Sequence, residues 1–465
     1  MKGFLKWGAI VVGCLVVVII AALVLIPMFV DVAKYKPILE SKVTAATGRP
    51  FSVGDDLSLS LFPWAGVSFS DLRLGNPAGF TEKNFVTVKS FEVRVKLLPL
   101  LSKDVQIKRF VLNEPQIVLV KNKKGLENWA QPKPAGKDAA EEKAPSTESV
   151  PGGLGIPISA LTAENISINN GSALWIDHTT DTRKEITDIG LILKDVSLNR
   201  PVKLTFSAQL DQKPLSLEGT VGPVGTGLKE GKIALDLSIK ALKQLVLRLK
   251  GNLENIITNP GVDMDIEVAE FSPRMLMSEL GQEFPVATTD PEAISRLALK
   301  AHIKADAKKV SLTNGNMELD QSKLKLSAAA TEYSRPNLKF DIDLDQIDLD
   351  RYMPPKSEEP AQAKTSASAE PAKKKTDYAP LRRLILDGSI KIAKLTVTKA
   401  KIEDAVLQIK AKDGVFNLDP IKLKMYQGGA AGNAVLNVAQ DTPLSLIHIS
   451  EPTRPTRASR MPSSA

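Results

Sequence analysis

The sequence predicts a mainly β protein with a few short helices (α+β), held to a membrane by one N-terminal transmembrane helix. Two observations predict this class: an uncharged apolar run near the N-terminus, and apolar residues at every second position through most of the remaining chain. Few helical patterns lie between the expected strands, so an elongated, twisted and chiefly antiparallel sheet is expected. The alternation alone does not decide between an open groove and stacked sandwiches.

The first element is the apolar run from 8 to 30, which carries no charge across 23 residues. A helix of this length crosses a hydrocarbon core of about 30 Å. No small-residue cleavage site closes the run, and Lys2 and Lys6 precede it, which favours a retained helix with a cytoplasmic N-terminus. A lipoprotein box at Cys14 is the weaker alternative, because the apolar residues follow the cysteine. We therefore expect residues 1–31 to form a cytoplasmic stub and a transmembrane anchor.

Three short helices are expected beyond the anchor. Apolar residues at helical spacing run from 32 to 47, and Gly48 with Pro50 forms a stop signal after them. Two further helices are predicted near Pro273–Leu280 and Pro291–Leu297, each with a proline close to its start.

Period-two runs make up most of the body, and each run has one apolar and one polar face. About twenty such runs can be counted, mostly separated by Gly, Pro, Asn or Asp. The clearest of them are 204–210, 233–239, 245–249, 262–268 and 340–344.

Two low-complexity stretches, 131–151 and 354–378, divide the body. They are rich in Pro, Ala, Lys, Glu and Ser and contain almost no large apolar residue, which predicts disordered linkers. An N-terminal module at 32–130, a central β-rich region at 152–353 and a C-terminal block at 379–443 remain.

The last 22 residues, 444–465, depart from the strand pattern that continues up to Pro443. The stretch from Leu444 to Pro455 resembles a translated sequencing-library adapter. We expect this tail to be non-native and the C-terminal block to be truncated; an ordinary disordered tail is the alternative.

The sequence contains few residues that could support catalysis or bind a metal. Cys14 is the only cysteine, there are three histidines, and no nucleophile elbow, metal-ligand cluster or Gly-rich nucleotide loop is present. We therefore predict no enzyme activity, no cofactor and no metal site. The formal charge of +8 is scattered through strand-like segments, and aromatic residues make up only 5% of the chain, so nucleic acid is not an expected partner.

Several conspicuous residues have structural interpretations. His178, beside an aspartate, is expected to be a solvated turn residue, and the alternate aspartates at 341–345 a solvated strand face rather than a calcium site. Trp64 and Trp129 are expected to anchor a core. Gly428-Gly429 is expected to supply a turn with positive φ.

Short motifs along nearly the whole chain are similar to one known family. In the N-terminal module they are Thr47-Gly48-Arg49-Pro50, Leu61-Phe62-Pro63-Trp64, Leu74 to Phe80, Leu97 to Leu101 and Gly125 to Trp129; later ones are Phe271 to Arg274, Asp290-Pro291, Leu349 to Pro355 and Tyr426 to Gly429. Together they resemble the AsmA family of Gram-negative envelope proteins. The turn at 319–324 departs from the family's more aspartate-rich pattern.

The resemblance implies a single-pass inner-membrane protein with a periplasmic body, related to bridge-like proteins whose β-groove carries lipids. It predicts that phospholipid is moved or held in an apolar β-groove for outer-membrane lipid homeostasis, with membrane lipids as partners. A lipid leaving a bilayer exposes roughly thirty methylenes, at a cost on the order of 25 kcal/mol. An open apolar groove would lower this cost; its candidate residues are Leu204, Phe206, Leu235, Leu237, Leu247, Met264, Ile266, Phe340 and Ile342. The alternative is a scaffold or chaperone that modulates outer-membrane protein assembly through exposed strand edges, with assembly components as partners.

Overall fold

The computed structural model describes most of the predicted body. It covers residues 32–102, 104–130, 162–225, 231–355, 379–426, 428–440 and 443–450. The predicted anchor at 8–30, the predicted linker at 131–151 and nearly all of the one at 354–378 lie outside these ranges. Among the helices within them, none is both long and apolar enough to cross a membrane. The chain forms two compact units, Met1–Lys243 and Gln244–Ala465.

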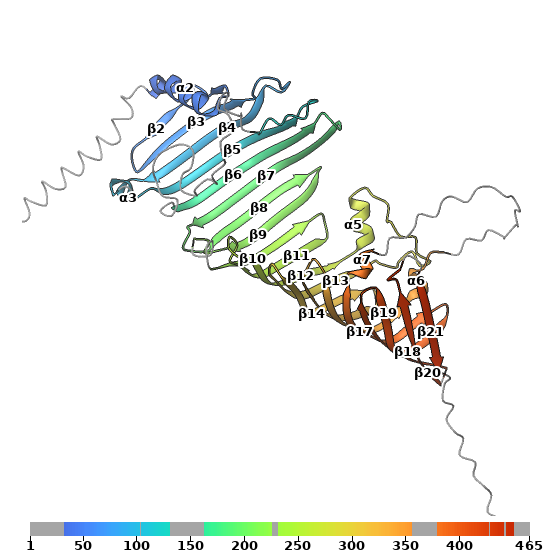
Figure 1. Cartoon of the computed structure of the whole chain (residues 1–465). Helices are drawn as coiled ribbons and strands as arrows, with labels where there is room; N and C mark the ends of the chain where they lie inside the picture. Colours follow the sequence, from blue (N-terminus) through green and yellow to red (C-terminus); the bar gives the residue numbers. More distant parts are fainter. Residues whose placement is uncertain are drawn as a thin grey trace, which may run out of the picture. The chain divides into compact units, whose positions relative to one another are not determined.

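The first unit is a sheet with short helical segments, coloured from blue to green in Figure 1. Its elements are η1 (Val32–Tyr35), α2 (Lys36–Thr47), β1 (Phe51–Ser52), β2 (Ser58–Ser60), β3 (Trp64–Gly75), β4 (Asn84–Lys96), α3 (Leu97–Leu101), β5 (Gln106–Lys121), β6 (Thr162–Asp177), β7 (Thr182–Val196), β8 (Val202–Leu210), β9 (Lys213–Val221) and β10 (Lys232–Ala241). The short strands β1 and β2 both pair with β3, and β3 to β10 follow one another in chain order.

The second unit is built in the same way. Its elements are β11 (Leu245–Glu254), β12 (Gly261–Phe271), α5 (Pro273–Glu279), β13 (Leu297–Ala305), β14 (Lys309–Leu319), β15 (Ser322–Thr331), β16 (Asn337–Asp348), α6 (Leu349–Tyr352), α7 (Ala379–Arg382), β17 (Ile385–Val397), β18 (Ala400–Lys412), β19 (Val415–Met425), β20 (Gly428–Asn437) and β21 (Leu444–Ser450). The strands β11 to β21 pair in chain order.

The predicted antiparallel pairing is confirmed with one exception in each unit. The pairs β5–β6 and β16–β17 are parallel. These strand pairs flank the stretches 131–151 and 354–378, so each long connection returns the chain to the same end of the sheet. A parallel pair needs such a crossover, whereas the antiparallel neighbours are joined by short turns.

Two of the three predicted helices are confirmed. The helix α2 ends where the backbone of Gly48 takes φ +66° and its N–H donates to the carbonyl of Thr44. The helix α5 begins after Ser272, whose hydroxyl accepts a hydrogen bond from the N–H of Met275.

The helix predicted at Pro291–Leu297 is wrong. Ile294 takes φ +62°, and the carboxylate of Asp320 accepts hydrogen bonds of 2.9 Å from the N–H groups of Ile294 and Ser295. A partner distant in sequence thus satisfies donors that would have begun a helix, and β13 starts at Leu297.

The turn predicted at Gly428-Gly429 is also wrong. Both glycines lie in β20, and the positive φ of +48° belongs to Tyr426. Elsewhere, non-glycine residues with positive φ occur where the strand register shifts, as at Asn170 in β6 and Asn314 in β14. Asn and Asp tolerate this left-handed backbone better than most residues, and such bulges increase strand twist.

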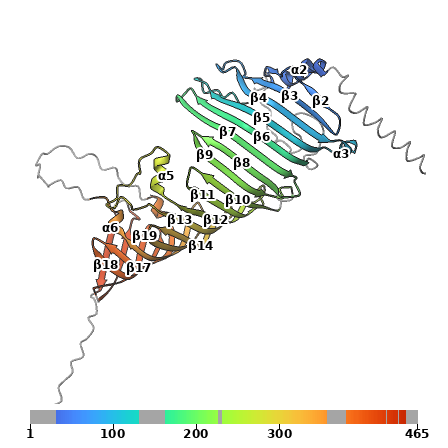
Figure 2. The ribbon, with the colours of Figure 1, turned by 180° about the vertical axis from the view of Figure 1, so that it is seen from behind.

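Each unit contains a single layer of strands. The strands of each unit contact their neighbours along one sheet, and the strands of the first unit can be followed one after another in Figure 1 and in the reverse view of Figure 2. Of the two arrangements that the sequence allowed, the open sheet is the one observed within each unit. The stacked sandwich is not found in the described residues.

The single layer leaves few side chains fully enclosed. In the described part of the chain, twelve apolar residues are buried: Val53, Val88, Val111, Val120, Ala163, Ala208, Ile233, Met264, Ala293, Ala301, Ala411 and Val438. Most other apolar strand residues are half-buried, covered by side chains of adjacent strands. Cross-strand pairs therefore carry much of the packing in these units.

The strand β21 includes the first residues of the predicted non-native tail. Its backbone pairs with β20, but four of its side chains, Leu444, Leu446, Ile447 and Ile449, are 66–73% exposed. The strand therefore buries little apolar area on either face. The origin of the tail stays a prediction.

Candidate functional site

The first unit carries a continuous apolar face. Residues directly opposite in paired strands project from the same side of a sheet, so the register defines rows that cross the strands. One row crosses β3 to β10 and contains Phe69, Phe91, Leu112, Ile168, Leu191, Phe206, Leu217 and Ile239. The next row contains Val67, Val93, Phe110, Ile166, Leu193, Leu204, Gly219 and Leu237. Neither row is interrupted by a polar residue.

Aromatic contacts join the first strands of these rows. The ring of Phe91 stacks on Phe69 at 4.8 Å between centroids and meets Phe110 edge-on at 5.3 Å. Such pairs add stabilisation beyond their buried area. The first strands of the face are therefore held by directional packing as well as by their backbone ladder.

The second unit has a comparable face that crosses β11 to β20. One row contains Leu253, Val262, Ala305, Val310, Ala330, Leu338, Leu386, Ala411, Phe416 and Leu436. The adjacent row contains Gly251, Met264, Ile303, Leu312, Ala328, Phe340, Gly388, Ile409, Leu418 and Ala434. Here too, every member of both rows is apolar or glycine.

The nine residues predicted to line a groove all lie on these faces. Leu204, Phe206 and Leu237 belong to the rows of the first unit, and Leu235 lies opposite Val221. In the second unit, Met264 and Phe340 share a row, and the remaining predicted residues pair with apolar partners: Leu247 with Val268, Ile266 with Leu249 and Ile342 with Ile390. Met264 is buried and the other eight are half-buried. That these residues bind a ligand stays a prediction.

Sequence reasoning missed much of both faces. It did not select the residues of β3 to β7, such as Phe91 and Leu112, or those of β17 to β20, such as Ile409. Their alternation is visible between register shifts, and strand-by-strand periodicity could have found them. The order of the rows across a parallel pair could not be obtained in this way.

In the second unit, the face opposite the apolar rows is polar and carries cross-strand ion pairs. The carboxylate of Glu267 lies 3.3 Å from Arg248 and 3.1 Å from Lys300, and Asp263 lies 2.9 Å from Lys304. These charges alternate in sign across neighbouring strands. Each pair is partly exposed and contributes modestly to stability, but the array keeps one face of the sheet hydrated.

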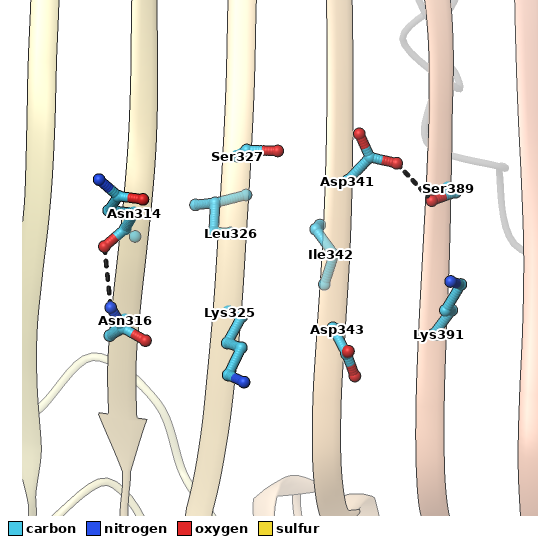
Figure 3. A pocket seen from close by; sticks show the side chains of 11 residues that line it. Asn314, Asn316, Lys325, Leu326, Ser327, Asp341, Ile342, Asp343, Ser389 and Lys391 are labelled. Carbon is cyan, nitrogen blue, oxygen red and sulfur yellow. Dashed lines mark hydrogen bonds between the residues drawn. The ribbon is translucent and has the colours of Figure 1, made fainter.

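A shallow cavity of about 500 Å³ lies on the polar face of the second unit. Its lining residues come from β14, β15, β16 and β17. Figure 3 shows their side chains, with Ser389 donating a 2.6 Å hydrogen bond to Asp341. Lys325, Asp343 and Lys391 also line it. Asp341, Asp343 and Asp345 are exposed, which confirms the predicted solvated face. Among the described residues, no group of His, Cys, Asp and Glu is arranged to hold a metal.

His178 lies in the predicted turn but is half-buried rather than solvated. Its Nε2 is 3.3 Å from Oε1 of Glu82. Burial raises the pKa of Glu82, but hydrogen bonds, including those from Thr81 and His178, outweigh burial and hold that pKa below its usual value. The contact fastens a loop to the end of β6.

The two tryptophans do not form the predicted buried core. Trp64 is half-buried beneath the ammonium of Lys108, 5.3 Å from its ring centroid. Trp129, also half-buried, packs against Trp175 at 5.3 Å between rings. In a single-layer sheet, large aromatic residues are covered by neighbours on the same face.

Comparison with known families agrees with this architecture and with the motifs. The model of the AsmA family matches residues 1–233 and 227–449, which is nearly the whole chain. The chain belongs to the AsmA family. It is 30% identical to the AsmA family protein YhjG of Escherichia coli (strain K12) over 136 residues, 27% of this chain and 20% of that protein. The chain thus spans about a fifth of that relative's length in the match. No solved structure matches the chain.

Three of the five AsmA motifs of the N-terminal module, Thr47 to Pro50, Leu74 to Phe80 and Gly125 to Trp129, meet at one end of the first unit. Arg49, 7% exposed, donates a 2.6 Å hydrogen bond to the carbonyl of Asn128 and lies 4.5 Å from the ring centroid of Phe85. The side chain of Asn128 donates to Asn76 at 2.8 Å. Burial lowers the pKa of the Arg49 guanidinium below its usual value. These motifs thus form a structural clasp.

The central AsmA motifs also converge, around Asp320. This carboxylate is 7% exposed and accepts from the N–H of Arg296 at 3.1 Å as well as from the two N–H groups at the start of β13. Arg351 binds Asp290 at 2.6 Å and also contacts Gln321. The turn at 319–324, where the sequence departs from the family pattern, is therefore the centre of this second clasp.

Proposed function

We propose that this AsmA family protein is held in the inner membrane by residues 8–30 and holds or moves phospholipids along the apolar faces of its periplasmic sheets. This activity would serve lipid homeostasis of the outer membrane. Family membership supports an envelope-associated role. The proposed mechanism is passive and non-enzymatic.

The observation that carries the proposal is the uninterrupted apolar rows on a single layer of strands. In the first unit the rows cross eight strands, which corresponds to about 34 Å at the usual strand spacing. This length exceeds the roughly 15 Å depth of one hydrocarbon leaflet. An acyl chain lying on such a face exchanges water for apolar side chains at about 0.8 kcal/mol per methylene removed from water.

The polar face supports the same proposal. The alternating charges keep the polar side of the second unit hydrated, so a lipid would have one apolar face to occupy there. The half-buried state of the apolar residues leaves area that a ligand can still cover. A fully packed core would leave none.

The direct test is site-specific photocrosslinking in the full chain, followed by lipid mass spectrometry. A photoreactive residue in place of Phe206 or Ile342 should capture phospholipid. The matched controls replace Thr205 and Asp343, which neighbour them on the polar face, and should capture little. Equal capture at both positions of each pair, or no lipid at either, would overturn the proposal. A lipid-free protein that captures unfolded porin would instead support the scaffold alternative.

The membrane topology is tested separately. A reporter enzyme fused after Pro355 should be active in the periplasm and inactive in the cytoplasm, and the fusion should remain with the membrane fraction. A soluble and shortened product would contradict the retained anchor but would leave the crosslinking result unaffected.

A further inference from the structure

An exposed apolar tip lies at one end of the first unit. The short helix α3 joins β4 to β5, with Leu98 79% exposed and Leu100 41% exposed. Phe62, 38% exposed, lies at the same end, because it precedes Trp64, which pairs with Lys96 at the start of α3. Isolated exposed apolar residues are ordinary, but a group at a sheet end indicates a contact surface.

Cations surround this tip on the polar face. Lys96 and Lys108 share one carboxylate, Glu164, with Lys96 at 2.5 Å. Arg94 and Arg109 share a second one, Glu92. Four cations thus share two carboxylates, which leaves a local excess of positive charge. The side chains of Arg94 and Arg109 are about half exposed, at 47% and 51%.

Three of these cations, Arg94, Lys108 and Arg109, line a cavity of about 470 Å³ together with the carboxylates of Glu164 and Asp195. Trp64 and Lys194 contribute to its wall, and Asn165 presents a buried side-chain oxygen that lacks a hydrogen-bond partner. A smaller cavity of about 300 Å³, lined by Lys96 and Arg200, lies next to Glu164 on the same end.

We infer that this end of the first unit docks on a membrane surface that contains anionic phospholipids. Leu98, Leu100 and Phe62 enter the interfacial region, while the cations around Glu164 and Glu92 contact the phosphate-bearing headgroups. Leucine and aromatic side chains bordered by Lys and Arg are the residues that interfacial segments use. Charge complementarity selects the anionic bilayer as the occupant. The inference concerns docking and does not require lipid transport along the sheet.

The test uses the full chain, with Cys14 replaced by serine, reconstituted in lipid nanodiscs. A Leu98→Cys variant is labelled with an environment-sensitive fluorophore, and lipids with a nitroxide near the headgroup serve as quenchers. The control label is placed at Ile257, a 64% exposed apolar residue in a turn of the second unit. Phosphatidylglycerol is present or absent as the anionic lipid.

The label at Leu98 should be quenched in the discs with phosphatidylglycerol, and the label at Ile257 should not. The Lys96→Gln/Lys108→Gln variant should weaken docking by about fivefold for each cation removed, roughly 25-fold in all. Its matched control is Arg248→Gln/Lys300→Gln, which also removes two cations that share one carboxylate. This control should leave the quenching unchanged.

Three results would overturn the inference. The first is an absence of quenching at Leu98 in every lipid mixture, and the second is equal quenching at Ile257. The third is quenching at Leu98 that is unchanged both by phosphatidylglycerol and by the Lys96/Lys108 substitutions. Binding of inorganic phosphate to the protein, without any quenching of the label at Leu98, would identify a soluble phosphate ligand instead of a membrane.

Discussion

The phenolic hydroxyl of Tyr352 donates a 2.8 Å hydrogen bond to the carboxylate of Asp320, although the two residues are 32 positions apart in the sequence. The contact joins α6 to the turn between β14 and β15. It closes the clasp that also fixes the start of β13. The clasp gives two AsmA motifs, Asp290-Pro291 and Leu349 to Pro355, a structural role within the second unit.

The hydrogen bond should be visible in an alkaline titration. Burial, and then the bond to Asp320, raises the pKa of Tyr352 to about 12. Because this folded pKa exceeds the unfolded value near 10, the stabilisation is complete below pH 10 and is lost between about pH 10 and 12. Asp320→Asn should lower the ionisation midpoint of Tyr352, measured by ultraviolet absorbance. Asp343→Asn, on an exposed strand position, should leave that midpoint unchanged.

Asp320→Asn should also destabilise the second unit in neutral solution. The charged acceptor of three backbone N–H groups is lost, at a cost of roughly 2–3 kcal/mol, while Tyr352→Phe should cost about 1 kcal/mol. Burial raises the pKa of Asp320, but its hydrogen bonds outweigh burial and leave that pKa below the usual value. Its stabilisation is therefore present above about pH 4 and lost as the pH falls further. Urea unfolding at several pH values would measure both effects; equal stability of the Asp320→Asn variant and the parent protein at pH 7 would contradict the clasp.

The alternating strands were accessible from the sequence, whereas their arrangement was only partly so. The runs at 204–210 and 262–268 became β8 and β12 because period two requires only local information. The parallel pair β16–β17 could not be predicted locally, since its strands are separated by a low-complexity stretch. The helix expected at Pro291–Leu297 failed for a similar reason: its N–H groups bind Asp320, which is distant in sequence.

The candidate site could likewise be predicted from the sequence only in part. Periodicity placed Phe206 and Phe340 on apolar faces, because side chains in a strand alternate strictly between faces. It could not show that no second sheet covers those faces within either unit, because the same alternation serves a sandwich. The positions of Trp64 and His178 also depended on partners from other strands and loops.

The two faces of β16 should respond differently to the same new side chain. Ile342→Asn places an amide in an apolar row, and Asp343→Asn places it among exposed polar groups. Because Ile342 is only half-buried, the variant should stay folded while its co-purifying phospholipid falls severalfold. Circular dichroism and lipid mass spectrometry would measure the two properties. Equal lipid content in both variants would contradict the proposed role of the apolar face.

The last prediction concerns the row that passes from β16 to β17. Gly388 lies opposite Phe340, and a Cβ at position 388 would be 2.4 Å from the phenylalanine ring. Gly388→Ala must therefore displace that ring, which should destabilise the second unit by about 1–3 kcal/mol. Gly429→Ala is the matched control, because a Cβ there has its nearest neighbour at 3.9 Å. Chemical unfolding would measure both variants, and adding Phe340→Leu should recover much of the loss at Gly388. If the Gly388→Ala variant is as stable as the parent protein, Phe340→Leu has no loss to recover. That result would show that the ring of Phe340 does not occupy this space.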